Sequence, residues 1–369
     1  MVVSASHTRE QQPLQLSQKQ KSLVVYGFGS AGKAIVDSLL DVGLHIDWII
    51  DKNKFGTRYR DIPIVSLAEM DKINNQNRDC LITLHNHYID IRAVYNELLA
   101  YHFCGVYLLS QLKNFSNEIR VTNGYWLDLD FNYAGHEVEI NTLKALLADK
   151  KSIELVDQIV SYRTSGDIND YPEPSLFDEY SPKDLPRYKG PIKLIDCGAF
   201  TGVAIEKLMH AGYAIDSFVA FEPDLVNYEK LSGKAFNVRH STCLPLGVWS
   251  CNTQLRFNSN ASMGSSIDSD GDTIIQCVRV DDVLKNYEPN LIKFDVEGAE
   301  VEAINGLEKT IKRYKPNLAI SVYHKPKHFF EIPLLINSWG LGYQFHLRVH
   351  EHNTFGVVVY CLQKDLIAA

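Results

Sequence analysis

The sequence predicts an α/β protein built from two largely parallel, doubly wound sheets. Two segments of the chain, 22–51 and 194–222, repeat one pattern: an apolar run, a glycine-rich turn, a helix-like stretch and a second apolar run that ends in an acid. This order is typical of a β-turn-α-β unit in a parallel sheet. The length of 369 residues agrees with two such sheets, because a domain usually spans about 100–200 residues.

The first sheet is expected within residues 21–115, after a mobile tail at 1–20 that is rich in Gln, Ser and Lys. Apolar runs predict the strands, and helical periodicity predicts the helices between them. The predicted strands are 23–26, 46–51, 80–84 and 105–109, and the predicted helices are 33–42 and 89–100. Their alternation indicates a small doubly wound domain.

The turn after the first strand carries G-x-G-x-x-G, with Gly27, Gly29 and Gly32, and Asp51 follows Gly32 by 19 positions. This is close to the roughly 20 residues that separate a dinucleotide fingerprint from its ribose-binding acid. Three interpretations stay open: a nicotinamide site, a nucleotide or nucleotide-sugar site, and a purely structural turn. Because about 110 residues are short for a complete dinucleotide enzyme, we favour the nucleotide-sugar interpretation over hydride chemistry.

Residues 116–189 are predicted to form a connector. Helical periodicity runs from 132 to about 167, and prolines between Pro172 and Pro186 predict an extended remainder. A second domain is then expected over 190–369. Its predicted strands are 192–196, 217–222, 244–249, 291–295, 317–323, 343–349 and 355–362, with helices at 203–210 and 299–311.

The glycine turn of the second domain has different spacing. It reads D-x-G-x-x-x-G, with Asp196, Gly198 and Gly202, and Glu222 ends the following strand. Glycines let a ligand approach the backbone, and Glu222 can accept hydrogen bonds from both hydroxyls of a ribose. A pyrophosphate favours the tighter dinucleotide turn, whereas Asp196 suits a cationic group. The pattern therefore predicts S-adenosylmethionine; glycines that only turn the chain are the alternative.

A third motif places more polar side chains at the same sheet edge. The apolar strand 291–295 ends in Asp295, Glu297 follows it, and His324 ends the next strand. Because open α/β sheets bind ligands at the carboxyl ends of their strands, we expect these three to face one crevice. Asp295 could instead cap the following helix, and His324 could be a satisfied strand-end histidine. A divalent metal held by the three side chains is a further alternative, although the sequence shows no convergence of ligands.

With these motifs in this order, residues 190–362 resemble the FkbM family of S-adenosylmethionine-dependent methyltransferases. The resemblance rests on residues 196–202, 221–223, 280–284 and 293–300, and residues 162–167 and 177–180 resemble the lead-in of longer members. It implies a class I methyltransferase Rossmann-like fold with a seven-stranded sheet. Here a smaller Rossmann-like α/β domain and a helical connector precede it. The resemblance also implies methylation of a hydroxyl, typically on a sugar, polyketide or other secondary metabolite.

Carried over by residue, the family pattern implies a cofactor site and a catalytic group. The implied cofactor-binding residues are Asp196, Gly198, Ala199, Phe200, Gly202, Glu222 and Pro223. For catalysis we predict that Asp295 orients or deprotonates the acceptor hydroxyl, with His324 as second candidate and Glu297 beside them. Two rival functions use other chemistry: an NAD-dependent oxidoreductase or sugar epimerase working through the first domain, and a non-catalytic sensor. Residues 26–64 resemble small Rossmann-like domains found beside sugar-modifying enzymes.

The composition and charge of the chain limit the classes of partner that it can bind. The chain has 37 basic and 45 acidic residues, a net charge of −8 and no basic block, which argues against nucleic acid. Seven scattered cysteines indicate reduced thiols of a cytoplasmic protein. No apolar run approaches the roughly 18 residues of a membrane span, and the start lacks a signal-peptide core. We expect a small-molecule or glycan acceptor, bound by the connector, residues 258–266 and the loop after Tyr323; a homodimer is an open option.

Overall fold

The computed structural model describes residues 2–5, 22–122, 126–258, 266–267 and 271–368. The chain divides into two compact units. The first, called the N-terminal unit, comprises Met1–Gly135, Asp157–Glu173 and His352–Phe355, and the second, the C-terminal unit, comprises His136–Val156, Pro174–Glu351 and Gly356–Ala369. The predicted connector is therefore not a separate body, since its residues are shared between the two units.

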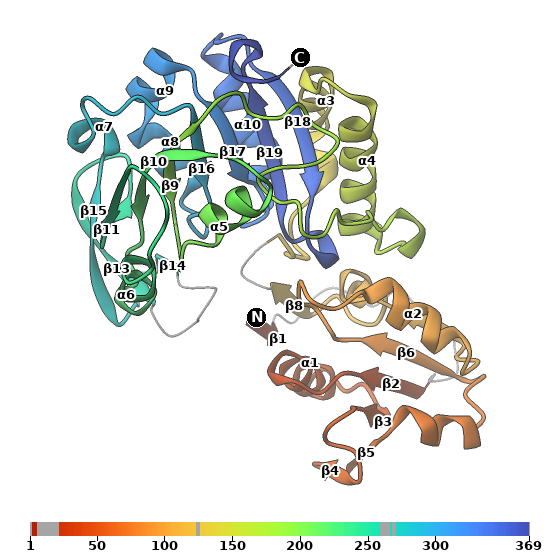
Figure 1. The fold of residues 1–369 in the computed structure, drawn as a ribbon. Coiled ribbons are helices and arrows are strands. Elements are labelled where there is room, and N and C mark those ends of the chain that lie inside the picture. Colours follow the sequence, from red (N-terminus) through yellow and green to blue (C-terminus); the bar gives the residue numbers. More distant parts are fainter. Residues whose placement is uncertain (1, 6–21, 123–125, 259–265, 268–270, 369) are drawn as a thin grey trace. The chain divides into compact units, whose positions relative to one another are not determined.

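The N-terminal unit is built around one mostly parallel sheet (Figure 1). Among the described residues its strand order is β4-β5-β3-β2-β6-β7, with only β4 antiparallel to its neighbour. The strands are β2 (Ser22–Tyr26), β3 (Ile46–Ile50), β4 (Thr57–Tyr59), β5 (Ile62–Val65), β6 (Arg78–Ile82) and β7 (Gly105–Tyr107), with helices α1 (Ser30–Asp41) and α2 (Ile91–Leu99). This confirms the predicted small α/β fold.

Two strands of this part of the chain, β1 (Val2–Ala5) and β8 (Ile119–Thr122), were not predicted. β1 pairs antiparallel with β8, although the sequence predicted a mobile tail over 1–20. Residues 6–21 of that tail lie outside the described residues. The helical periodicity of the connector corresponds to α3 (Glu137–Leu146) and α4 (Lys150–Ser165), which confirms its helical character.

The C-terminal unit contains, within the described ranges, a seven-stranded sheet of order β11-β10-β9-β16-β17-β19-β18. Only β19 runs antiparallel to its neighbours. The strands are β9 (Ile192–Cys197), β10 (Ile215–Phe221), β11 (His240–Leu244), β16 (Leu291–Phe294), β17 (Asn317–Ser321), β18 (Gln344–Val349) and β19 (Val357–Leu362). Every residue of β16, β17 and β19 is buried, as expected for central strands covered on both faces. The predicted seven-stranded fold is confirmed.

Helices and a small second sheet complete this unit (Figure 1). The helices include α5 (Val203–His210), α6 (Leu225–Ser232), α7 (Val280–Val283), α8 (Glu300–Gly306), α9 (Glu308–Tyr314) and α10 (His328–Ser338). Among the described residues the small sheet has the order β12-β15-β13-β14 and was not predicted. Its strands are β12 (Gly247–Val248), β13 (Thr253–Asn258), β14 (Ser266–Ile267) and β15 (Thr273–Val278).

Two predicted elements of the C-terminal unit are divided. The strand expected at 244–249 overlaps β11 only at Leu244, where β11 ends, and its remainder contains β12 of the other sheet. Pro245 lies between them and cannot donate a backbone hydrogen bond. The helix expected at 299–311 is α8 and α9, separated at Leu307. Gly306 is the last residue of α8 and packs against the Trp249 carbonyl oxygen: a Cβ added to Gly306 would lie 2.1 Å from that oxygen.

Two predictions from composition concerned the cysteines and the membrane-spanning segments of the chain. All seven cysteines are free thiols. Within the described parts of the chain, every helix is too short or too polar to cross a bilayer.

Candidate active site

The turn that follows β9 is held against the end of β16. Gly198 has φ +80°, and a Cβ added there would lie 1.9 Å from the Asp295 carbonyl oxygen. The Asp295 amide donates to the Cys197 carbonyl oxygen at 3.0 Å, which continues the pairing of the two strands. Gly202 has φ +90° at the start of α5, so both glycines use backbone conformations that side chains disfavour. Asp295 is therefore placed directly beside the glycine turn.

Glu222 connects this turn to the end of β10. Its Oε2 accepts from the Phe200 amide at 2.6 Å, and its Oε1 accepts from the Asp224 amide at 3.0 Å. Glu222 is 6% exposed, and burial raises the pKa of its carboxyl group to about 7. A carboxylate has roughly four acceptor positions, so two remain for a ligand. Ala199 is buried, and its amide donates to the Phe221 carbonyl oxygen at 2.9 Å; Pro223 follows Glu222.

Asp196 and Lys293 form a buried ion pair on the neighbouring strands β9 and β16. The Lys293 Nζ lies 3.1 Å from Asp196 Oδ1 and 3.6 Å from Asp295 Oδ2, and it donates to the Gly198 carbonyl oxygen. Burial alone would lower the pKa of Lys293, but Asp196 and Asp295 outweigh it and raise that pKa. The ammonium thus stays charged and joins the turn to both acids.

The three predicted catalytic side chains are brought together. His324 Nε2 lies 3.6 Å from Asp295 Oδ1 and 3.5 Å from Glu297 Oε2. Glu297 has φ +51°, an unfavourable conformation for a residue with a side chain. Asp295 and Glu297 keep about a quarter of their side-chain surface exposed, whereas His324 is buried. The two carboxylates can therefore reach a ligand, with the imidazole behind them.

His324 is in turn fixed by Glu300, a buried residue of α8. Its Nδ1 lies 2.8 Å from Glu300 Oε1, and His328 Nδ1 lies 3.0 Å from Glu300 Oε2. Burial alone would lower the pKa of His324, but Glu300, Glu297 and Asp295 raise it to about 10. The same pairing holds the pKa of Glu300 well below its usual value. At neutral pH His324 is an imidazolium.

Several residues of this edge were missed by the sequence prediction. Lys293 and Glu300 lie inside recognised motifs but were given no role. The Tyr180 hydroxyl donates to Asp295 Oδ2 at 3.2 Å from a segment that precedes β9. Burial and the nearby Glu179, Asp295 and Glu297 raise the pKa of Glu351 to about 8. Tyr180 lies in the segment 177–180 that resembles the lead-in of longer family members, and Glu351 follows the predicted strand 343–349, but neither position showed which side chains lie nearby.

The geometry agrees with the comparison to known families. Residues 196–345 match the family model described as the Methyltransferase FkbM domain. The span starts at Asp196 and includes the glycine turn, Glu222, Asp295 and His324. Residues 196–345 form an FkbM methyltransferase domain. This assignment implies S-adenosylmethionine-dependent methyltransferase activity and confirms the family resemblance stated from the sequence.

A solved structure shares the fold of nearly the whole chain. The crystal structure of methyltransferase FkbM from Methylobacillus flagellatus KT is similar with a TM-score of 0.73 and 20% sequence identity, over 93% of this chain and 90% of that chain. The likeness therefore covers both α/β units. No curated protein matches the sequence.

The residues of the FkbM domain fit the cofactor that the family implies. Two buried acids, Asp196 and Glu222, flank the glycine turn, and the neighbouring cation Lys293 is already paired with Asp196. A phosphate group would meet the Glu222 carboxylate at this turn, whereas ribose hydroxyls can donate to it. The charge of Asp196 is balanced by Lys293. Among the described residues, no cluster of three or more His, Cys, Asp or Glu side chains forms a potential metal site.

The N-terminal glycine turn is stabilised by its own acid. Asp51 Oδ2 accepts from the Phe28 amide at 2.8 Å, and Oδ1 accepts from the Asn53 and Lys54 amides at 2.9 and 3.0 Å. Gly27 has φ +101°, and a Cβ on Gly32 would lie 2.2 Å from the Gly27 carbonyl oxygen. Gly29 has open space around it. The four predicted residues thus form one turn, in which Asp51 already bonds three backbone amides.

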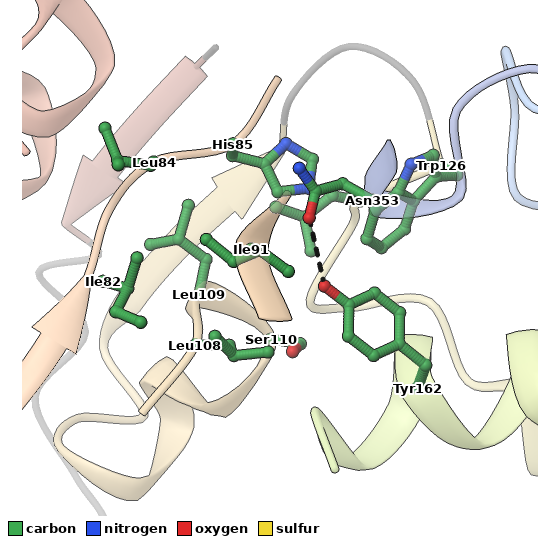
Figure 2. A pocket seen from close by; sticks show the side chains of 11 residues that line it. Ile82, Leu84, His85, Ile91, Leu108, Leu109, Ser110, Trp126, Tyr162 and Asn353 are labelled. Carbon is green, nitrogen blue, oxygen red and sulfur yellow. Dashed lines mark hydrogen bonds between the residues drawn. The ribbon is translucent and has the colours of Figure 1, made fainter. Parts of the chain in front are cut away.

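A small cavity lies within the N-terminal unit, beyond the ends of β6 and β7 (Figure 2). Its volume is about 10 Å³, close to the space of one water molecule. His85 lines it, and burial lowers the pKa of that imidazole to about 4. Other lining residues include Ile82, Leu108, Trp126, Tyr162 and Asn353. The Tyr162 hydroxyl donates to Asn353 Oδ1 at 3.4 Å. The cavity is too small for a nucleotide.

Proposed function

We propose that this methyltransferase transfers the methyl group to a hydroxyl of a sugar, a glycan or a related secondary metabolite. The observation that supports the proposal is the link between the Asp295 carboxylate and the glycine turn: the Lys293 Nζ lies 3.6 Å from Asp295 Oδ2 and donates to the Gly198 carbonyl oxygen. The surrounding side chains are acids and tyrosines that suit a hydroxyl-rich acceptor. The rest of the predicted acceptor region, residues 259–265, lies outside the described residues.

In this proposal, Asp196, Gly198, Ala199, Phe200 and Gly202 hold the methionine part of S-adenosylmethionine, and Glu222 with Pro223 holds its ribose. When bound, the cofactor supplies an electrophilic methyl group on a sulfonium. Glu222 accepts hydrogen bonds from the ribose hydroxyls, and Asp196, which is fully buried, acts through the turn that it helps to hold. Lys293 keeps Asp196 and the Gly198 carbonyl group in place.

Asp295 is assigned the role of orienting the acceptor hydroxyl and accepting its proton. The oxygen must lie in line with the methyl group, and positioning of this kind supplies much of the acceleration in such reactions. His324 is already protonated, so we assign it the role of a charge partner for Asp295 and Glu297 rather than that of the base. Glu297 contributes a second acceptor for the hydroxyls of the substrate.

The test is a methyl-transfer assay on purified protein with S-adenosylmethionine and a panel of free sugars, nucleotide-sugars and phenols. We expect a product heavier by one methylene unit, and no product from the matching deoxy acceptor. Asp295→Asn should lower the rate by about 100-fold or more, as loss of a proton-accepting group does. The exposed Asp365→Asn serves as control. Equal activity of Asp295→Asn would contradict the assigned role, and methylation of amines or carbons alone would contradict the hydroxyl.

A further inference from the structure

The segment that precedes β9 adopts an unusual backbone at two positions. Phe177 has φ +73° and Tyr180 has φ +69°, and neither is a glycine. This conformation is unfavourable for a residue with a side chain, and it persists only where the surroundings hold it. The segment lies outside residues 196–345, the span that matches the FkbM domain. Its conformation is therefore a property of this chain that the family assignment leaves open.

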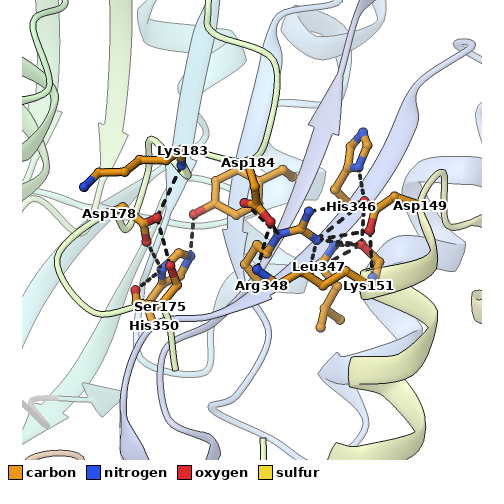
Figure 3. Close-up of polar contacts among 12 residues, drawn as sticks. Asp149, Lys151, Ser175, Asp178, Lys183, Asp184, His346, Leu347, Arg348 and His350 are labelled. Atoms are coloured by element: carbon orange, nitrogen blue, oxygen red, sulfur yellow. Dashed lines mark hydrogen bonds and ion pairs between the residues drawn. The ribbon is translucent and has the colours of Figure 1, made fainter. Parts of the chain in front are cut away.

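Side chains of β18 and of His350, which follows it, hold the segment of residues 175–184 (Figure 3). The Ser175 amide donates to the Val349 carbonyl oxygen at 2.7 Å, and the Ser175 hydroxyl donates to Asp178 Oδ2 at 2.8 Å. His350 Nδ1 lies 3.2 Å from Asp178 Oδ1 and 3.0 Å from the Ser175 carbonyl oxygen. Both partners accept hydrogen bonds, so Nδ1 carries the proton.

The other side of the His350 ring reaches Tyr180 through Tyr360. The Tyr360 hydroxyl lies 2.8 Å from His350 Nε2 and accepts from the Tyr180 amide at 3.0 Å. Since Nδ1 carries the imidazole proton, Nε2 accepts a hydrogen bond from the Tyr360 hydroxyl. A buried chain of hydrogen bonds thus runs from Asp178 through His350 and Tyr360 to the backbone of Tyr180.

Asp184, which follows Tyr180 in the sequence, attaches the segment a second time. Arg348 Nε lies 3.0 Å from Asp184 Oδ2, and Lys151 Nζ lies 2.8 Å from the same atom (Figure 3). Between the two attachments, Lys207 Nζ from α5 lies 2.5 Å from Glu179 Oε2. The segment is thus fixed before, at and after Tyr180.

The side chain of Tyr180 then meets the proposed catalytic acid. Tyr180 is 4% exposed, and its hydroxyl donates to Asp295 Oδ2 at 3.2 Å. The ammonium of Lys293 lies 3.6 Å from the same oxygen. One oxygen of Asp295 is therefore held by a hydroxyl and a cation, while Oδ1 faces His324.

We propose that Tyr180 is a positioning residue for methyl transfer, whose hydroxyl fixes the Asp295 side chain, and that the chain from Asp178 through His350 and Tyr360 fixes Tyr180. The inference rests on the proposed role of Asp295. It adds a residue from outside the matched domain to the reaction.

The first test follows Tyr180 itself and needs no acceptor. Protein labelled with 3-fluorotyrosine is compared by ¹⁹F NMR with the Tyr180→Phe variant, whose missing resonance assigns Tyr180. We expect Asp295→Asn and His350→Gln to shift that resonance. Tyr343→Phe removes a hydroxyl that donates to the Pro316 carbonyl oxygen, outside this network, and should leave it in place. A Tyr180 resonance that does not move in either variant would overturn the proposal.

The second test is kinetic and uses an acceptor identified by the panel above. Tyr180→Phe should lower kcat by about tenfold through misplacement of Asp295, with the KM for S-adenosylmethionine and the affinity for S-adenosylhomocysteine changed less than about twofold. A purely structural role would lower the cofactor affinity and the thermal stability together, and full kcat in Tyr180→Phe would contradict positioning. If no acceptor is methylated, the proposed function fails, and the NMR result still decides the link between Tyr180 and Asp295.

Discussion

The two glycine turns of the molecule are built in the same way but have different chemical surroundings. In each turn a phenylalanine amide donates to the acid that ends the next strand: Phe28 to Asp51 at 2.8 Å and Phe200 to Glu222 at 2.6 Å. Asp51 accepts two further amides of its own loop, whereas Glu222 accepts one and is buried. The shared bond therefore reflects how such a turn folds, and it does not by itself identify a ligand.

The neighbours of the turns make the difference. Beside the C-terminal turn lie a buried Lys293, paired acids and a protonated His324. Beside the N-terminal turn lie the Thr83 hydroxyl, which donates to the Gly27 carbonyl oxygen at 2.6 Å, and the apolar Leu84. A cation, Lys54, donates to the Phe28 carbonyl oxygen at 2.6 Å. The two turns therefore differ in the charged side chains that surround them, although both are rich in glycine and their turn-closing hydrogen bonds are alike.

The largest effect is expected from Lys293→Met. Removing one partner of a buried ion pair leaves Asp196 uncompensated, which typically costs about 3–5 kcal/mol of unfolding free energy. Lys33→Met, at the exposed start of α1, should cost less than about 1 kcal/mol. Urea denaturation of both variants measures the difference. If Lys293→Met and Lys33→Met unfolded at similar urea concentrations, the charged side chains beside the C-terminal turn would stabilise the fold no more than those beside the N-terminal turn.

Gly198→Ala and Gly29→Ala should differ by a smaller amount. The first adds a Cβ at φ +80° and 1.9 Å from a carbonyl oxygen, whereas the second adds it in open space at φ −69°. We expect a loss of about 1–3 kcal/mol or more for Gly198→Ala and about 0.5 kcal/mol or less for Gly29→Ala. Thermal unfolding with and without S-adenosylhomocysteine is the measurement. A destabilising Gly29→Ala would contradict the described turn.

Much of this contrast was accessible from the sequence, and the reason is local. β9, β10 and β16 are apolar runs that end in Cys197, Phe221 and Phe294, so the acids and glycines beside them could be placed at one edge. The β13 strand alternates polar residues with Leu255 and Phe257, a pattern typical of a half-buried strand that the sequence prediction overlooked. Tyr180 could not be found, because it meets Asp295 across 115 positions of sequence. Nor does a sequence reveal which buried charge pairs with which.

The smallest predicted effect is a pH dependence of cofactor binding. Glu222 has a pKa raised to about 7, and its carboxylate form accepts hydrogen bonds from ribose hydroxyls. Below that pH the group is protonated and loses acceptor capacity, so affinity for S-adenosylhomocysteine should rise as pH increases through 7. The change should be at most about tenfold per pH unit. Calorimetry from pH 6 to about pH 8 tests it. Glu222→Gln should bind S-adenosylhomocysteine more weakly, and its affinity should not change with pH. If its affinity changed with pH as much as that of the wild type, the titrating group would be a residue other than Glu222.

The most direct test of the comparison is isothermal titration calorimetry of three proteins: the wild type, Glu222→Ala and Asp51→Ala. Each is titrated under identical conditions with S-adenosylhomocysteine, then with NAD and with a UDP-sugar. Two charge-assisted hydrogen bonds of about 1.5–3 kcal/mol each would be lost with Glu222, a weakening of about 100-fold or more. We predict that loss for Glu222→Ala and wild-type affinity for Asp51→Ala. Unchanged binding by Glu222→Ala, or binding lost in Asp51→Ala, would contradict the assignment of the cofactor to the C-terminal turn.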